Sequence, residues 1–144
     1  MKNYDLAIAS DHAGVQLKAK IITTLHHLGM KVLDLGPVTD ERVDYPDFAN
    51  KLVQEIIDGT VEKGVLICGM GIGMSIAANR SSEIRAALCL NELMADKARS
   101  HNNANVLVLG SKLIPDNLSI KIVDKFLNTK LEGGRHANRL AKIH

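Results

Sequence analysis

The feature that most constrains this chain is the regular alternation of short apolar runs with longer helix-like segments along its whole length. Five runs rich in Val, Ile, Leu and Ala have the length of strands: residues 4–9, 31–35, 64–68, 84–90 and 105–109. Six further segments are expected to be helical: residues 14–28, 46–59, 74–79, 92–100, 115–128 and 135–144. Alternation of this kind predicts a parallel sheet with helices on both faces.

Residues with strong positional preferences mark several of the expected helix ends. Gly29 follows the first helix, where a left-handed residue commonly ends a helix. Pro46 suits the first turn of the second helix, and Asn91 is a good N-cap for the fourth. The run Gly64–Cys68 is apolar throughout, which is typical of a strand covered on both faces.

Length and composition indicate one domain, residues 1–144, and exclude several function classes. The chain has 144 residues and a net charge of +2, which is too weak a bias to imply a nucleic-acid partner. Its only aromatic residues are two Tyr and two Phe, so it has little to stack bases on. The sequence therefore predicts no nucleic-acid partner.

Neither a membrane span nor a disulfide framework is expected. The longest uncharged run, Gly64–Asn79, is shorter than the roughly 20 residues that span a bilayer, and it contains four glycines. There are two cysteines and no signal peptide, which favours the cytoplasm. No His, Cys, Asp or Glu set has the spacing of a metal site.

Residues that carry chemistry gather where the expected strands end. In parallel sheets, ligands bind at the carboxyl ends of the strands, near a switch in strand order. Asp11-His12 follows the first strand, Cys68 ends the third and Gly110-Ser111 ends the fifth. His101-Asn102 instead ends the fourth helix, at the opposite edge of the sheet, which indicates a site shared across an interface.

Cys68 is followed by a glycine-rich turn, Gly69–Gly73, that opens a helix. Backbone N–H groups in such a turn can hold an oxyanion or activate a thiol. A dinucleotide fingerprint fails because Met74 replaces its last glycine, and a thioredoxin-type pair fails because position 71 is Gly. No Gly-Lys-Ser/Thr is present, and the first Arg after Cys68 is Arg80, too far away for a thiol phosphatase. Cys89 is interpreted as a core residue.

Three other groups each admit a structural and a functional interpretation. Asp11 either caps the following helix or contacts a ligand hydroxyl, with His12 beside it. His101 either interacts with the end of its helix or belongs to a site. Arg135 and Arg139 are spaced to share one helix face, where they either bind a phosphate or remain solvated.

Taken together, these residues resemble the type B ribose-5-phosphate isomerases, a family that includes allose- and galactose-6-phosphate isomerase subunits. The resemblance covers nearly the whole chain and is most specific in the central segment. Its markers are Ser10–Gly14, Asp44–Pro46, Cys68–Asn79, His101-Asn102 and Gly133–His136.

The resemblance implies a three-layer α/β/α Rossmann-like domain with a five-stranded parallel sheet and a C-terminal helical arm, residues 132–144. It also implies aldose–ketose isomerisation of a sugar phosphate through an enediolate, without a cofactor or metal, in the pentose phosphate pathway. Family members form homodimers, sometimes paired into tetramers, with shared active sites. We expect the arm to dock on the partner subunit.

The resemblance also suggests a role for each site residue. It implies that Cys68 is the base that moves a proton between C1 and C2, and that His101 opens the furanose ring. Further residues are expected to bind the substrate. The hydroxyl or ring-oxygen ligands are Asp11, Tyr45 and Asn102, the anion hole is Gly69, Met70, Gly71, Ile72 and Gly73, and the phosphate ligands are His12, Arg135 and Arg139.

Two residues depart from the family pattern. Met70 replaces a Thr or Ser hydroxyl, and Lys112, a further substrate-binding candidate, replaces an Arg and loses its bidentate geometry. Ribose 5-phosphate is the expected substrate. The alternatives are a six-carbon aldose 6-phosphate and, outside the enzymes, a non-catalytic sugar-phosphate or nucleotide binding module.

Overall fold

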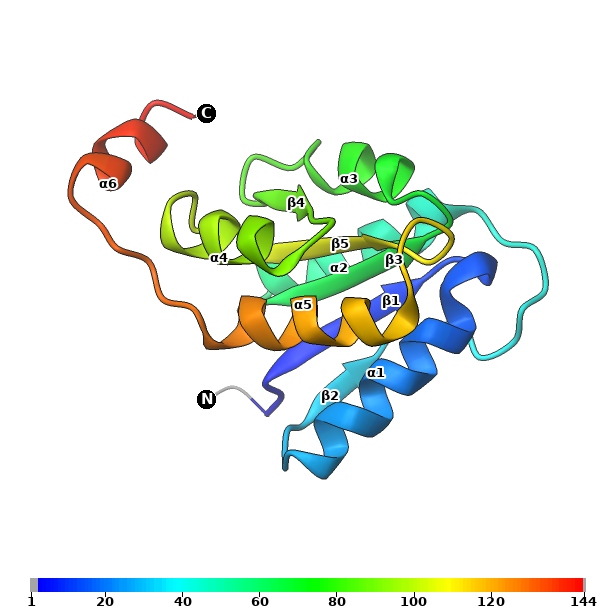
Figure 1. The fold of residues 1–144 in the computed structure, drawn as a ribbon. Coiled ribbons are helices and arrows are strands. Elements are labelled where there is room, and N and C mark those ends of the chain that lie inside the picture. The colour runs from blue at the N-terminus through cyan, green and yellow to red at the C-terminus, as the bar shows by residue number, and fades with distance from the viewer. Residues whose placement is uncertain (1–2, 144) are drawn as a thin grey trace.

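The computed structural model describes residues 3–143; Met1, Lys2 and His144, which the expected domain 1–144 includes, lie outside the described residues. The strands and helices alternate as the sequence predicts (Figure 1). The strands are β1 (Leu6–Ser10), β2 (Val32–Asp34), β3 (Gly64–Cys68), β4 (Ala86–Leu88) and β5 (Val106–Gly110). The helices are the 3₁₀ turn η1 (His12–Gly14), α1 (Val15–His27), α2 (Tyr45–Ile57), α3 (Ile72–Ala78), α4 (Glu92–Ser100), α5 (Asp116–Asn128) and α6 (Arg135–Leu140).

The five strands form one sheet in the order β2-β1-β3-β5-β4, and every neighbouring pair is parallel. This confirms the predicted parallel sheet. Strand β2 pairs on one side of β1, and β3 pairs on the other side. The strand order therefore reverses at β1, and the carboxyl ends of β1 and β3 form a switch point, where α/β proteins bind ligands.

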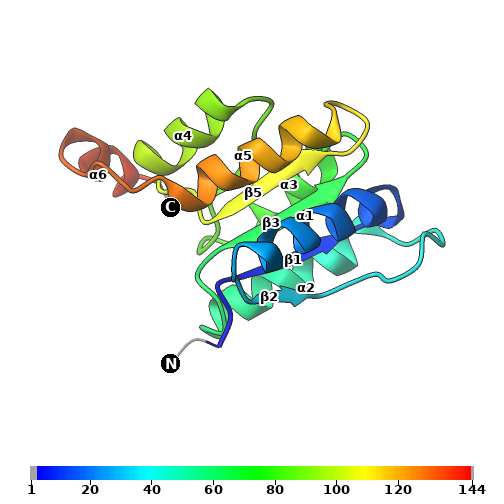
Figure 2. The same cartoon turned by 60° about the horizontal axis from the view of Figure 1, so that its bottom comes forward.

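Helices cover both faces of the sheet, which makes the three expected layers (Figure 2). Apolar residues of α1, α4 and α5 pack on one face, and those of α2 and α3 pack on the other. Strands β1, β3 and β5 are buried along their whole length, as the continuous apolar run in β3 predicts. None of the helices in residues 3–143 is long and apolar enough to cross a membrane.

Several element boundaries differ from the sequence-based expectation; β1 begins at Leu6 instead of residue 4, and α6 ends at Leu140 instead of residue 144. Two further differences have a clear local cause. Helix α3 begins at Ile72 instead of residue 74, because Gly71 turns the chain and its carbonyl accepts from the N–H of Ser75 at 3.1 Å. Strand β4 is shorter than the expected run 84–90. The N–H of Ile84 donates to the carbonyl of Ser81 in a turn, so this residue does not join the ladder.

The C-terminal helical arm is confirmed. After α5 the chain runs in an extended path and ends in α6, which lies apart from the sheet, beyond the C-terminal end of α4 (Figure 1). The N–H of Glu132 donates to the carbonyl of Ser100 at 2.9 Å, which ties the extended segment to that end of α4.

Candidate active site

Asp11 and Cys68 lie at the switch point between β1 and β3. Asp11 follows β1, Cys68 ends β3, and the two strands are neighbours in parallel register. The N–H of Asp11 donates to the carbonyl of Ile67 at 3.0 Å, so the ladder continues past the end of β1. Both side chains are largely buried, with 8% exposed for Asp11 and 6% for Cys68. The structure thus brings a carboxylate and a thiol to the same edge of the sheet.

The turn after β3 directs a backbone donor at the thiol. Sγ of Cys68 accepts a hydrogen bond from the N–H of Gly71 at 3.2 Å. Gly71 has φ = +80°, and a Cβ at this position would lie 2.6 Å from Cδ1 of Leu88. Both the left-handed backbone and the close contact require glycine. The local geometry of the thiol therefore depends on Gly71.

Backbone hydrogen bonds join this turn to the segments after β1 and β5. The N–H of Ser111 donates to the carbonyl of Cys68, and the N–H of Lys112 donates to that of Gly69, both at 2.9 Å. Oγ of Ser111 donates to the carbonyl of Ala13 at 2.8 Å. Cδ of Lys112 lies 3.7 Å from where a Cβ on Gly69 would stand, so this side chain lies over the turn.

Tyr45 contacts the same turn from the start of α2. A Cβ on Gly73 would lie 2.6 Å from Cζ of Tyr45 and 3.0 Å from its hydroxyl oxygen. The missing side chain of Gly73 thus makes room for the Tyr45 ring. Met70 and Ile72 lie within the turn, and both are exposed. The structure brings Tyr45 and the whole turn, residues 69–73, together with Cys68.

Asp11 and His12 are held by local hydrogen bonds. A carboxylate oxygen of Asp11 accepts from the N–H of Ala13 at 2.9 Å and caps η1, which confirms its capping role. Nδ1 of His12 accepts from the N–H of Val43 at 3.2 Å. In the neutral imidazole the proton is then on Nε2, so that His12 retains one donor for a ligand.

The remaining candidate residues lie at the opposite edge of the sheet. His101 follows α4, and the carbonyl of Asn102 accepts from Nε of Arg85 at 3.2 Å, just before β4 begins. This is the amino edge of the strands, whereas Cys68 ends β3 at the carboxyl edge. Arg135 and Arg139 are exposed on α6. One chain therefore does not bring the two groups of candidate residues together.

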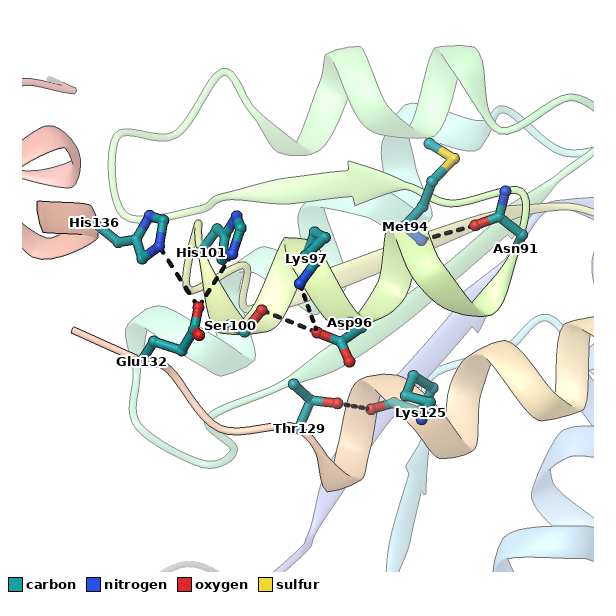
Figure 3. Close-up of polar contacts among 10 residues, drawn as sticks. All are labelled: Asn91, Met94, Asp96, Lys97, Ser100, His101, Lys125, Thr129, Glu132 and His136. Carbon is teal, nitrogen blue, oxygen red and sulfur yellow. Dashed lines mark hydrogen bonds and ion pairs between the residues drawn. The ribbon is translucent and has the colours of Figure 1, made fainter. Parts of the chain in front are cut away.

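Three side chains at the amino edge contact one another, and we call them the His–Glu–His cluster: His101, Glu132 and His136 (Figure 3). Nε2 of His101 and Nε2 of His136 lie 3.1 and 3.5 Å from the same oxygen, Oε2 of Glu132. The two imidazole rings are stacked, with centroids 4.0 Å apart and an interplanar angle of 15°. This contact holds the beginning of α6 against the end of α4.

The surroundings of His136 favour its neutral form. Desolvation lowers the pKa of His136, and the neighbouring His101, Arg135 and Arg139 lower it further, while Glu132 acts in the opposite direction. Its side chain is also the most buried of the three, since the whole residue is 7% exposed.

Glu132 and His136 are the site residues that sequence reasoning missed. Their spacing of four was a usable signal, because such pairs can meet on a helix. However, Gly133 and Gly134 separate them, and both have positive φ. The contact with His101 joins segments about thirty residues apart and has no local signature.

Comparison with known proteins agrees with this fold. The sequence model described as Ribose/Galactose Isomerase matches residues 6–143. The crystal structure of a ribose 5-phosphate isomerase from Thermotoga maritima superposes with a TM-score of 0.95, at 53% identity, over 98% of this chain and 97% of that one. A ribose-5-phosphate isomerase B from Mycoplasma genitalium with bound ribulose-5-phosphate gives 0.92 at 43% identity, over 99% of this chain and 95% of that one.

A relative from Rickettsia conorii is 54% identical over 99% of both chains and carries only the broader, provisional name of sugar phosphate isomerase. The fold, the site at the strand ends and the similarity to these proteins together define a class, the α/β isomerases. The chain belongs to the ribose/galactose isomerase family, and it is similar over nearly its whole length to type B ribose-5-phosphate isomerases. This confirms the family resemblance and the expectation of an isomerase.

Proposed function

We propose that this isomerase interconverts ribose 5-phosphate and ribulose 5-phosphate through an enediolate, with Cys68 as the base. The observation that carries the proposal is the buried Cys68 thiol, which accepts the Gly71 N–H at 3.2 Å beside Asp11. The name of the Mycoplasma genitalium structure, with its bound ribulose-5-phosphate, supports the choice of substrate. We expect the enzyme to act in the cytoplasm, in the pentose phosphate pathway.

In this mechanism the base moves one proton between adjacent carbons. The Cys68 thiolate takes the proton from C2 of the open-chain aldose and returns it to C1, while the hydroxyl proton passes from O2 to O1. Most of the energy barrier comes from the negative charge that develops on the enediolate oxygens. A preorganised backbone donor at such an oxygen contributes about 3 kcal/mol. The N–H of Gly71 donates to Cys68, so the other N–H groups of residues 69–73 would be the main stabilising elements.

Side chains around the turn would bind the sugar. We expect Asp11 and the hydroxyl of Tyr45 to contact sugar hydroxyls. The packing of Tyr45 on Gly73 beside the turn supports this role for Tyr45. His12 retains Nε2–H as a donor for the phosphate, because Nδ1 is occupied by Val43. Lys112 lies over the turn and adds positive charge.

The complete site would need a second copy of the chain. His101, Asn102, Arg135 and Arg139 lie at the other edge of the sheet from Cys68. We therefore propose a homodimer in which one protomer supplies Cys68, Asp11 and Tyr45. Its partner supplies His101 to open the furanose ring, Asn102 to bind a hydroxyl and the two arginines of the arm to bind the phosphate.

An apolar surface around β4 supports this assembly. Strand β4 is at the edge of the sheet, and its outer side is unpaired in the described chain. Exposed apolar side chains flank this edge from α3, from α4 and from the segment that joins β4 to α4: Ile72, Ile76, Leu90, Leu93 and Met94. Exposed edges with neighbouring apolar side chains are typical of surfaces that pair with another chain.

The role of Cys68 is tested by replacing each cysteine in turn. Cys68→Ala should lower kcat by at least about 10²–10⁴-fold, because a positioned base is lost. The matched variant Cys89→Ala should keep turnover close to wild type. In deuterated water the wild type should exchange the transferred proton and Cys68→Ala should not. Near-normal turnover by folded Cys68→Ala would refute the assignment.

Shared sites are tested by mixing two inactive variants. In a dimer of one Cys68→Ala chain and one His101→Ala chain, one site keeps both Cys68 and His101. Equal amounts, dissociated and reassociated at random, should regain about 25% of wild-type activity, since half of the dimers are mixed and each has one intact site. No recovery despite mixed dimers, shown by mass spectrometry, would place both residues in one protomer's site.

The identity of the sugar substrate is tested by comparing turnover of three sugar phosphates. The family description includes galactose, which keeps a six-carbon aldose 6-phosphate as the alternative substrate. Parallel assays on ribose 5-phosphate, allose 6-phosphate and galactose 6-phosphate should give the highest kcat/KM for the pentose. A higher kcat/KM for either hexose phosphate would make that sugar the assigned substrate, while the type of reaction would stay the same.

A further inference from the structure

The His–Glu–His cluster has the donor set of a transition-metal site. Two imidazoles and one carboxylate each offer a ligand atom, and these three atoms all lie within 4.8 Å of one another. Imidazole nitrogens suit zinc and its neighbours, whereas magnesium and calcium prefer oxygen ligands alone. Two His and one Glu are also the protein ligands of known three-ligand zinc sites.

The spacing of the donors matches tetrahedral coordination. With metal–ligand bonds of about 2.0–2.1 Å, two ligand atoms of a tetrahedral site lie about 3.3 Å apart. The distances from Oε2 of Glu132 to Nε2 of His101 and of His136 are 3.1 and 3.5 Å. These two edges of the coordination polyhedron are therefore already in place without a metal.

We propose that His101, Glu132 and His136 bind a divalent ion of the zinc class, and that the bound ion inhibits the isomerase reversibly. The fourth position would be open to water. The inhibitory half rests on the proposed function, in which His101 opens the sugar ring. An ion bound to Nε2 of His101 would hold this imidazole in the cluster and keep it from acting on the sugar.

The backbone positions of all three ligands are set by the fold. The N–H of Glu132 donates to the carbonyl of Ser100, the residue before His101, at 2.9 Å. The N–H of His136 donates to the carbonyl of Gly133 at 3.2 Å, which begins α6.

Metal binding requires the stacked rings to separate. Their planes are 15° apart, so the nitrogen lone pairs run nearly parallel and must turn to converge on one ion. The side chains of His101 and Glu132 are 32% and 57% exposed and have room to move, whereas His136 is held. Because of this rearrangement, binding should be reversible and removable by a chelator.

The experiment titrates zinc chloride into the untagged, full-length protein, freed of metal by a chelator, in a calorimeter with a buffer that does not bind zinc. The wild type should bind one ion per chain. Glu132→Gln and His136→Gln should each weaken binding by at least about 30-fold, because even outer-shell partners change metal affinity 10–100-fold. His27→Gln, which removes an exposed histidine of α1, should bind like the wild type.

Cys68 is the main competing ligand, and Cys68→Ser tests it directly. This variant should keep the wild-type zinc affinity. Loss of zinc binding in Cys68→Ser, or unchanged binding in both Glu132→Gln and His136→Gln, would overturn the site. Circular dichroism checks that each variant is folded. Cobalt(II) bound to the wild type should show the visible bands of a tetrahedral site without thiolate charge-transfer absorption, which no loss of folding could mimic.

Inhibition is measured separately with ribose 5-phosphate. Zinc should inhibit the wild type and His27→Gln equally, and a chelator should restore activity. The ratio of activities with and without zinc should stay near one in Glu132→Gln. Zinc binding without inhibition would overturn the inhibitory half alone. If the enzyme does not turn over this sugar, the proposed function fails, while calorimetry still decides whether the cluster binds the ion.

Discussion

Two turns of this molecule join a parallel strand to a helix, and each carries one of its two cysteines. Cys68 is the last residue of β3, and Cys89 directly follows β4. Both are buried, yet their surroundings differ. Sγ of Cys68 accepts a backbone N–H at 3.2 Å. Sγ of Cys89 instead donates to the carbonyl of Ala87 at 3.7 Å, and burial raises its pKa to about 11.

The difference lies in the backbone after each cysteine. After Cys68, Gly71 takes the left-handed conformation, turns its N–H to the sulfur and starts α3 without a side-chain cap. After Cys89, Asn91 is extended and its side chain accepts from the N–H of Met94 at 2.8 Å, which caps α4 (Figure 3). A capping side chain satisfies helix donors within the protein, whereas a glycine leaves them for a thiol or a ligand.

The largest effect should follow from Gly71→Ala. A Cβ here meets Leu88 at 2.6 Å and must adopt φ = +80°, so the turn has to move and the donor to Cys68 is lost. We expect kcat to fall by at least about 100-fold, comparable to the loss of an oxyanion donor. Turnover assays on the purified variant measure this effect.

Gly29→Ala is the matched control. Gly29 has φ = +79°, but a Cβ there meets nothing within 4 Å. It should therefore cost only the left-handed strain of about 1–2 kcal/mol in unfolding free energy and leave kcat unchanged. Equal kcat in the two variants would show that catalysis does not depend on the hydrogen bond from Gly71 to Cys68.

A smaller effect should follow from Met70→Thr, in the same turn. The hydroxyl adds to this turn the donor that the family resemblance implies at position 70. One net hydrogen bond contributes about 0.5–1.5 kcal/mol, so kcat should rise by about two- to tenfold. Met70→Val, which has the same shape as Thr without the hydroxyl, should give no increase. If Thr and Val behave alike, then side-chain size and not the hydroxyl is responsible.

These two turns also indicate how far the sequence alone could lead. The bounds of β3 were predicted because Gly64–Cys68 is apolar throughout, and the Asn91 cap was predicted because its preference is local. The start of α3 was predicted two residues too late, since nothing local reveals that Gly71 is left-handed. A left-handed residue is defined by the packing around it, here the contact with Leu88.

The site followed the same division between local and distant contacts. Asp11 and Cys68 were placed together correctly, because neighbouring parallel strands bring their carboxyl ends to one edge. The stack of His101 on His136 could not be predicted, since it depends on the path of the chain after α5. The role of Gly73 was also missed, because it makes room for a ring that comes from α2.

No effect on activity is expected from replacing Cys89. The comparison of the two cysteines predicts instead that Cys89 makes the stability of the protein depend on pH. The thiol has a pKa of 9.0 in an open chain and about 11 when folded. The unfolded state therefore loses its proton first, so this contribution to stability is complete below about pH 9 and declines as the pH rises toward 11. Two units correspond to roughly 2–3 kcal/mol at most.

Urea unfolding of the wild type and Cys89→Ala at pH 8 and pH 11 isolates this contribution. Other groups titrate in this range, but they do so in both proteins and cancel in the difference. The wild type should lose more unfolding free energy between the two pH values than Cys89→Ala, while both turn over substrate equally at pH 8. Equal losses would mean that the Cys89 thiol ionises as easily when folded as when unfolded. Burial alone would then not distinguish Cys89 from Cys68, and the contrast would rest on the Gly71 donor.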